Sequence, residues 1–115
     1  PMAVTYISNL TIYTGTDFSQ TFVLEDSQSN SVKDLTGYSA CAQMKRYESS
    51  QKTEDFTIAF ANDRTTGRIT ISLNDTETGA LKAGKYFYDL LLNGPTGLTE
   101  RVVEGTVLVK KSITR

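Results

Sequence analysis

Short runs of alternating apolar and polar residues, each ended by turn-forming residues, are the feature that most limits how this chain can fold. In DLTGYSACAQMKR (34–46), apolar side chains occupy every second position from Tyr38 to Met44, and Cys41 lies on the opposite phase. A period of two is that of a β-strand with one buried face. Because such runs recur along the chain, the sequence predicts an all-β sandwich or barrel.

We expect about seven strands in a single domain. The expected strands are residues 5–13, 18–25, 38–46, 55–61, 68–73, 85–92 and 101–110. The last two form a hairpin around NGPTG (93–97), and residues 74–84 tolerate helix, which predicts one helical turn before the sixth strand. The chain has 115 residues and no linker, repeat or low-complexity stretch, as expected for one domain.

The stretch LKAGKYFYD (81–89) indicates which kind of sandwich this is. Tyr86 lies two residues inside a strand that is entered through Gly84, like the tyrosine of a tyrosine corner in immunoglobulin-like domains. Its hydroxyl should then return to nearby backbone. Tyr88 takes the position where an antibody domain has its second cysteine, and the chain has no tryptophan. We therefore predict a single immunoglobulin-like β-sandwich without the antibody core.

The N-terminal residues allow two interpretations. We divide the chain into residues 1–12, an N-terminal arm or first strand, and residues 13–115, the immunoglobulin-like domain. An arm with an unpaired edge is a template for pairing with another chain. A first strand would instead be part of the sandwich.

The composition excludes most catalytic and metal sites. The chain has no histidine and one cysteine, so a Ser-His-Asp triad, a Cys-His pair and an ordinary zinc site are excluded. No glycine-rich phosphate-binding motif is present. The stretches NDRTTG and NDTE are rich in oxygen ligands, but they do not match a calcium loop and are typical of turns. We expect no enzymatic activity, no cofactor and no metal.

Charge and hydropathy limit the partners. Twelve basic and 13 acidic residues give a net charge of −1, which does not favour nucleic acid or an anionic membrane. No apolar run approaches the roughly 18 residues of a spanning helix. The single Cys41 forms no intramolecular disulfide and is typical of synthesis in a reducing cytoplasm. We expect no nucleic acid, membrane or small-molecule substrate as a partner.

The stretch KYFYDLLL (85–92) is apolar on both faces, which is unusual for a strand with one solvated face. Tyr86 and Tyr88 lie on the expected core face, and Phe87 and Leu91 on the other. Either neighbouring side chains cover the second face, or it binds a partner. If Asn93 pairs with Leu98, then Tyr88 pairs with Val103 and Tyr86 with Gly105.

This register defines the candidate residues of the chain. The interface candidates are Phe87, Leu91, Val102, Leu108 and Cys41, and the structural candidates are Tyr86, Tyr88 and Gly84. Acidic side chains at 89, 100 and 104 border the apolar ones. An apolar centre with a charged edge is typical of a protein–protein interface.

Six stretches together resemble one family. They are GTDFSQTFVLED, DLTGYSACAQMKR, GRITISL, LKAGKYFYDLLL, RVVEGTVLV and the final TR, and they run from about Gly15 to Arg115. In this order they resemble the small immunoglobulin-like structural domains of tailed bacteriophages, similar to the N-terminal domain of the siphophage upper-baseplate protein.

The resemblance implies a non-enzymatic virion structural protein that is made in the host cytoplasm. As an adaptor or decoration subunit, it would dock on the tail, baseplate, fibre or capsid, with other virion proteins or further copies of itself as partners. Multidomain relatives continue beyond this domain, so a chain that stops at Arg115 favours a stand-alone subunit. The alternative is an immunoglobulin-like surface-binding module for carbohydrate or host attachment. Such a module should expose aromatic residues in loops, where Tyr47 is the candidate.

Overall fold

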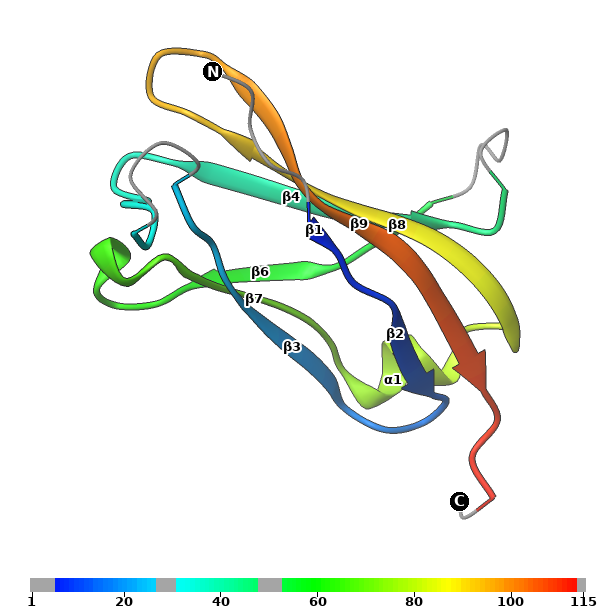
Figure 1. Cartoon of the computed structure of the whole chain (residues 1–115). Coiled ribbons are helices and arrows are strands. Elements are labelled where there is room, and N and C mark those ends of the chain that lie inside the picture. Colours follow the sequence, from blue (N-terminus) through cyan, green and yellow to red (C-terminus); the bar gives the residue numbers. More distant parts are fainter. Residues whose placement is uncertain (1–5, 27–30, 48–52, 114–115) are drawn as a thin grey trace.

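The computed structural model is a sandwich of two β-sheets (Figure 1). It describes residues 6–26, 31–47 and 53–113. The elements in chain order are β1 (Tyr6–Ile7), β2 (Leu10–Tyr13), β3 (Phe18–Val23), β4 (Ser39–Lys45), β5 (Glu54–Asp55), β6 (Thr57–Phe60), η1 (Arg64–Thr66), β7 (Arg68–Leu73), α1 (Asp75–Gly79), β8 (Gly84–Asn93) and β9 (Thr99–Lys110). The predicted all-β, immunoglobulin-like sandwich is confirmed, as is the helical turn before β8.

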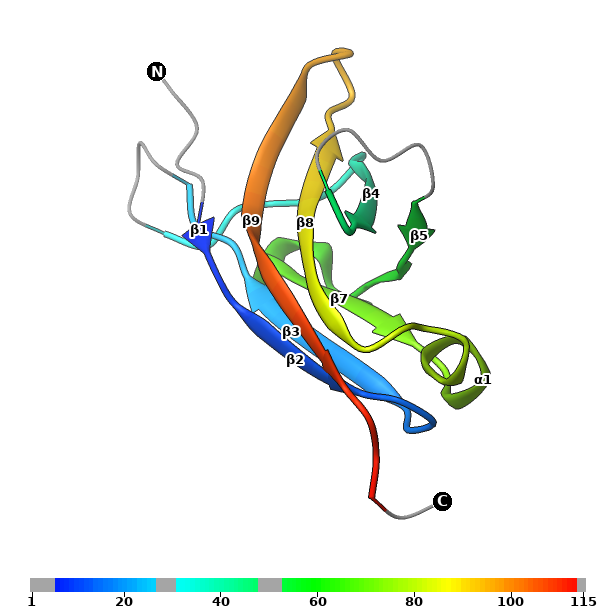
Figure 2. The ribbon, with the colours of Figure 1, turned by 90° about the vertical axis from the view of Figure 1, so that its right-hand side faces the viewer.

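The larger sheet has the order β1-β9-β8-β4-β5, with β2 also paired to β9, and the smaller sheet has the order β3-β7-β6. Figure 2 shows β9, β8 and β4 side by side, with β5 beyond β4. The strands pair antiparallel except β1 and β2, which run parallel to β9. The described part of residues 1–12 is thus strand within the sandwich, and residues 1–5 lie outside the described residues.

Two expected strands are each divided in two. The run 55–61 divides at Phe56. Before it, β5 pairs with β4 in the larger sheet, and after it, β6 pairs with β7 in the smaller sheet. Phe56 itself is buried, with its ring 6.2 Å from those of both Phe18 and Tyr88. The aromatic contacts therefore tie the crossing segment to both sheets.

The core lies between the sheets and follows the predicted alternation. Ala42 and Met44 of β4 are buried, and Ile69 and Ile71 of β7 are fully buried. Larger apolar side chains of β8 and β9 complete it, Leu90 and Val103 among others. Full burial of one such side chain contributes on the order of 1.5–3 kcal/mol to folding.

The second divided strand is the expected run 5–13. It separates into β1 and β2 where the chain crosses β9 closely. A Cβ added to Gly105 would lie 2.1 Å from the carbonyl oxygen of Ser8, so the crossing requires glycine. The Tyr88 hydroxyl donates to that same carbonyl over 2.7 Å. Asn9 Oδ1 accepts the Thr106 backbone N–H over 3.1 Å, in place of a strand partner. The interruption at Ser8 and Asn9 is therefore satisfied by side-chain hydrogen bonds.

The start of β8 has the geometry of a tyrosine corner. The Tyr86 hydroxyl donates to the Lys82 carbonyl over 2.8 Å, four residues upstream. Gly84 has φ +143°, and a Cβ there would lie 2.8 Å from the Arg46 guanidinium. That guanidinium lies over the Tyr86 ring, 5.7 Å from its centroid.

The expected register of the β8–β9 hairpin is wrong. Asn93 pairs with Thr99 rather than Leu98, because the Gly94 N–H donates to the Leu98 carbonyl and holds Leu98 in the turn. This shift of one residue, together with a second shift at a β-bulge, pairs Tyr88 with Gly105 and not Val103.

A β-bulge then shifts the register again. Leu90 pairs with Val103 and Leu91 with Arg101, which leaves Val102 as an extra residue on β9. A bulge of this kind places two residues opposite one. Val102 and Val103 are consequently both buried, although they are neighbours in a strand.

Candidate functional site

A hollow of about 650 Å³ lies on the outer face of the larger sheet. Its walls come from β4, β8, β9 and the β1–β2 crossing. The hollow therefore lies over the strand whose second apolar face the sequence singled out.

Two apolar side chains of β8 line this hollow. Phe87 is 42% exposed, and Leu91 is partly buried opposite Cys41 on β4. Leu108 on β9 is 43% exposed and lies next to Lys85 in the strand register. Among the interface candidates, Phe87, Leu91, Leu108 and the exposed Cys41 thus share the outer face.

Val102, the fifth interface candidate, does not lie on this face. It is 5% exposed and belongs to the core. The physical reason is the bulge, which turns its side chain inward beside Val103. Its assignment to the interface is therefore corrected.

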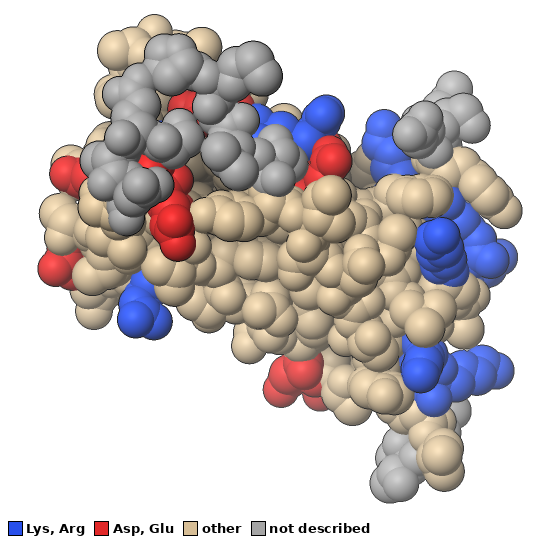
Figure 3. Space-filling model, viewed as in Figure 1, with Lys and Arg blue, Asp and Glu red and all other residues tan. Residues whose placement is uncertain are grey.

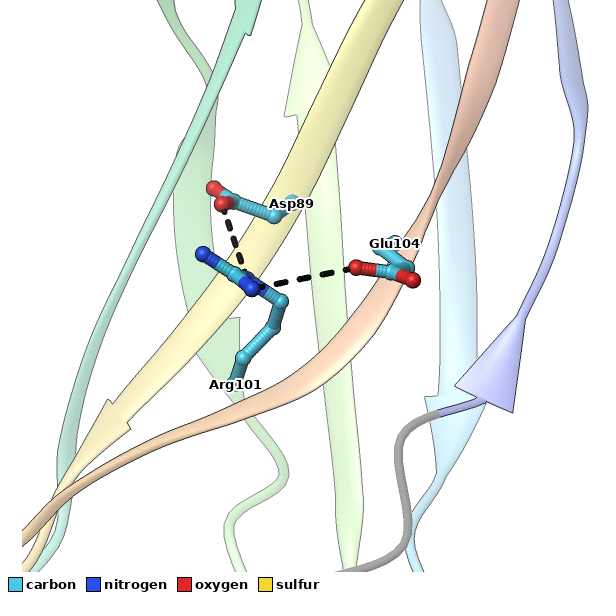
Figure 4. A network of polar contacts seen from close by, with 3 residues as sticks. All are labelled: Asp89, Arg101 and Glu104. Atoms are coloured by element: carbon cyan, nitrogen blue, oxygen red, sulfur yellow. Dashed lines mark hydrogen bonds and ion pairs between the residues drawn. The ribbon is translucent and has the colours of Figure 1, made fainter.

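Charged side chains form a network beside the apolar ones (Figure 4). Arg101 Nε lies 3.2 Å from Asp89 Oδ2, and Arg101 Nη1 lies 3.9 Å from Glu104 Oε1. Nearby on β4 and β5, Gln43 donates to Asp55 over 2.7 Å. These groups are all partly or fully exposed, so the ion pairs contribute little to stability, and their charges are available to a partner.

The bulge assembles this network. Residues three apart in a regular strand point to opposite faces, because side chains alternate. The extra residue Val102 restores Arg101 and Glu104 to the same outer face. Sequence reasoning placed Glu104 and Asp89 at the border but missed Arg101 as the bridging group. The adjacent valines 102 and 103, which break the alternation, are the signal that could have revealed it.

Glu100 was also expected at this border and lies elsewhere. It pairs across the hairpin with the buried Leu92, and its carboxylate lies 3.9 Å from Lys33 Nζ. This contact joins the hairpin to the segment before β4.

The charge on the outer face changes sign along β8. Lys85 Nζ lies 5.4 Å from the Phe87 ring centroid, and Lys45 is the register neighbour of Phe87 on β4. Figure 3 shows lysine and arginine gathered at the end where β8 begins and β9 ends, with most acidic residues in view elsewhere. The hollow is therefore cationic toward the start of β8 and anionic toward its middle.

The structural candidates on β8 point the other way, into the core. Tyr86 and Tyr88 are 7% and 4% exposed. Burial raises the pKa of Tyr88 above that of a free tyrosine, and its hydrogen bond to Ser8 partly offsets this rise. Both tyrosines position the strand and leave the outer face to its neighbours.

Within residues 6–26, 31–47 and 53–113, no group of three acidic, cysteine or histidine residues is placed to hold a metal ion. No helix among these residues has the length and apolar character needed to cross a membrane.

No protein-family model and no curated protein matches the chain. Among solved structures, it is similar to an internalin-like protein of Listeria monocytogenes, with 13% identity and a TM-score of 0.46 over 94% of this chain and 28% of that one. It is also similar to the extracellular domain of the voltage-gated sodium channel beta4 subunit, described as a parallel homodimer with a role in cell–cell adhesion. There the identity is 10% and the TM-score 0.41 over 98% of both chains.

With TM-scores below 0.5, these two likenesses carry no functional argument. The description as immunoglobulin-like rests on the strand order and the tyrosine corner of the chain itself. The bacteriophage part of the family resemblance stays a prediction.

Proposed function

We propose that this chain is a non-enzymatic structural subunit of a bacteriophage particle, which docks on a neighbouring virion subunit through the outer face of its larger sheet. We term this surface the docking face. Its residues are Lys85, Phe87, Asp89, Leu91, Arg101, Glu104 and Leu108. The sequence motifs support the virion origin, and the hollow around Phe87 supports the choice of face.

The single observation that carries the docking role is the exposed aromatic side chain on a central strand. Phe87 lies in the hollow with Leu91 beside it and the Asp89–Arg101 ion pair at its edge. Apolar residues surrounded by polar ones are the usual anatomy of an interface, and a few central large side chains dominate its energy. Because β8 is paired on both sides, the face is ordered before binding, which reduces the entropy lost on association.

One observation favours the alternative, a surface-binding module for carbohydrate or host attachment. The Phe87 ring shares the hollow with amide groups of Asn9 and Gln43, and binding pockets for small ligands commonly combine aromatic walls with a few polar groups. Tyr47, the expected loop aromatic, is 62% exposed.

Particle occupancy tests the proposal. Mass spectrometry of purified virions would give the copy number of the wild-type chain and of Phe87→Ala, with thermal unfolding of each isolated protein measured in parallel. Val23→Ala is the matched control, because Val23 is 45% exposed but lies on the smaller sheet. We expect Phe87→Ala to lower occupancy about tenfold or more with little change in Tm, and Val23→Ala to leave occupancy unchanged.

Three results would count against this proposal. Equal occupancy of the two variants would show that the docking face lies elsewhere. Absence of the wild-type chain from particles would refute the virion role. Glycan binding that is lost in Phe87→Ala, in a protein absent from particles, would establish the alternative.

A further inference from the structure

We propose that the neighbouring subunit at the docking face is a second copy of this chain, packed face to face about a two-fold axis that crosses the strands. This inference rests on the proposed docking role and names its partner. The observation behind it is that the face carries a charge pattern complementary to itself.

The pattern follows β8 residue by residue. Phe87 lies midway between Lys85 and Asp89, and all three point outward. At about 3.3 Å per residue, each charge lies about 7 Å from the aromatic side chain along the strand. On β9 the neighbour of Lys85 is apolar Leu108, whereas the neighbour of Asp89 is Glu104. Arg101 pairs with both of these carboxylates and leaves that side with one net negative charge. Lys45 on β4 lies level with Phe87. Along β8 and β9 the face is therefore cationic on one side of Phe87 and net anionic on the other.

A two-fold axis across the strands reverses positions along them. With the axis over Phe87, the two Phe87 rings meet at the centre of the pair. Lys85 of each copy then lies over Asp89 of the other, so each ion pair forms twice. Closed two-fold dimers have this reciprocity, in which residue i contacts j and j contacts i. A parallel arrangement would instead bring like charges together.

The two lysines at the start of β8, Lys82 and Lys85, form no ion pair with another described residue. The ion pairs among the described residues are made by Lys33 and Arg101, away from this end, whereas the Lys85 ammonium lies over the Phe87 ring. An antiparallel pair places each cationic end against the anionic part of the other copy, which offsets the charge separation of both. This complementarity favours a second copy over an unrelated partner.

Paired charge reversals test the arrangement. Sedimentation velocity should show a dimer for the wild-type chain at low salt, weakened at high salt because exposed charges are screened. Lys85→Glu makes both sides anionic and Asp89→Lys makes both cationic, so each variant alone should associate about tenfold or more weakly. An equimolar mixture of the two restores opposite charges at both contacts, and it should form a heterodimer.

Lys82→Glu is the matched control, because it makes the same charge change at the same end but outside the docking face. We expect this variant to dimerise like the wild type. A monomeric wild type, or a mixture that stays monomeric, would overturn the dimer, as would an equal loss in Lys82→Glu. A monomer that still needs Phe87 for particle occupancy would leave the docking proposal standing. A dimer absent from particles would refute the virion role and keep the dimer.

Discussion

Single hydroxyl groups fix the strand that carries the docking face. Tyr86 and Tyr88 lie on one side of β8. They donate to the carbonyls of Lys82, just before the strand, and of Ser8, in the β1–β2 crossing. Their alternate neighbours, Phe87 and Asp89, are thereby held outward. At this scale the sequence was informative, since the spacing of Gly84 and Tyr86 predicts the corner without any tertiary information.

Tyr86→Phe should destabilise the domain by about 1 kcal/mol, because the part-buried hydrogen bond to the Lys82 carbonyl is lost. Tyr13→Phe is the control, since Tyr13 is 49% exposed at the end of β2. Denaturant titrations of both variants measure the difference in the free energy of unfolding. Equal losses of unfolding free energy in the two variants would contradict a specific stabilising role of the Tyr86 hydrogen bond.

At the level of elements, the alternation predicts where strands lie but not how they register. Arg68–Leu73 was predicted at its observed bounds, because its alternation is regular and turns flank it on both sides. The hairpin register depends on which residue closes the turn at Gly94, and the bulge depends on core space for Val102. The first is set within the hairpin by the hydrogen bond from Gly94 to Leu98, whereas the second is set by packing between elements far apart in the chain. The Asp89–Arg101–Glu104 network depends on the bulge, and the adjacent valines at 102 and 103 are its one signal in the sequence.

The crossing of the β1–β2 junction over β9 provides a second test. Gly105→Ala would place a methyl group against the Ser8 carbonyl, and relief of this clash would separate the strands. We expect a loss of about 1–3 kcal/mol, as for overpacked cores. Gly79→Ala is the control, since a Cβ there meets its nearest neighbour at an ordinary 3.8 Å. Thermal unfolding distinguishes them, and a Gly105→Ala protein as stable as Gly79→Ala would contradict the close crossing.

The first and last described strands of the chain pair with each other. β1 and β2 pair with β9, and Ser112 donates to the Thr14 carbonyl as the chain leaves that strand. Contacts between residues so far apart in the sequence carry a large loop-closure cost. The larger sheet is complete only when its first and last strands have paired. The choice between arm and first strand could not be made from the sequence, because residues 5–13 read as a strand in either case.

Deletion of residues 1–9 tests whether the described part of this segment is needed for the fold. The deletion removes β1, the Ser8 carbonyl that accepts from Tyr88 and the Asn9 side chain that accepts from Thr106. An unsatisfied buried tyrosine costs about 1–3 kcal/mol and each lost hydrogen bond about 1 kcal/mol, so we expect a large fall in the free energy of unfolding. Asn9→Ala, which removes one acceptor, should cause a smaller fall. If the truncated domain unfolds at the same denaturant concentration as the full chain, the segment is a detachable arm, and reduced particle occupancy of that stable variant would place its contact on a neighbouring subunit.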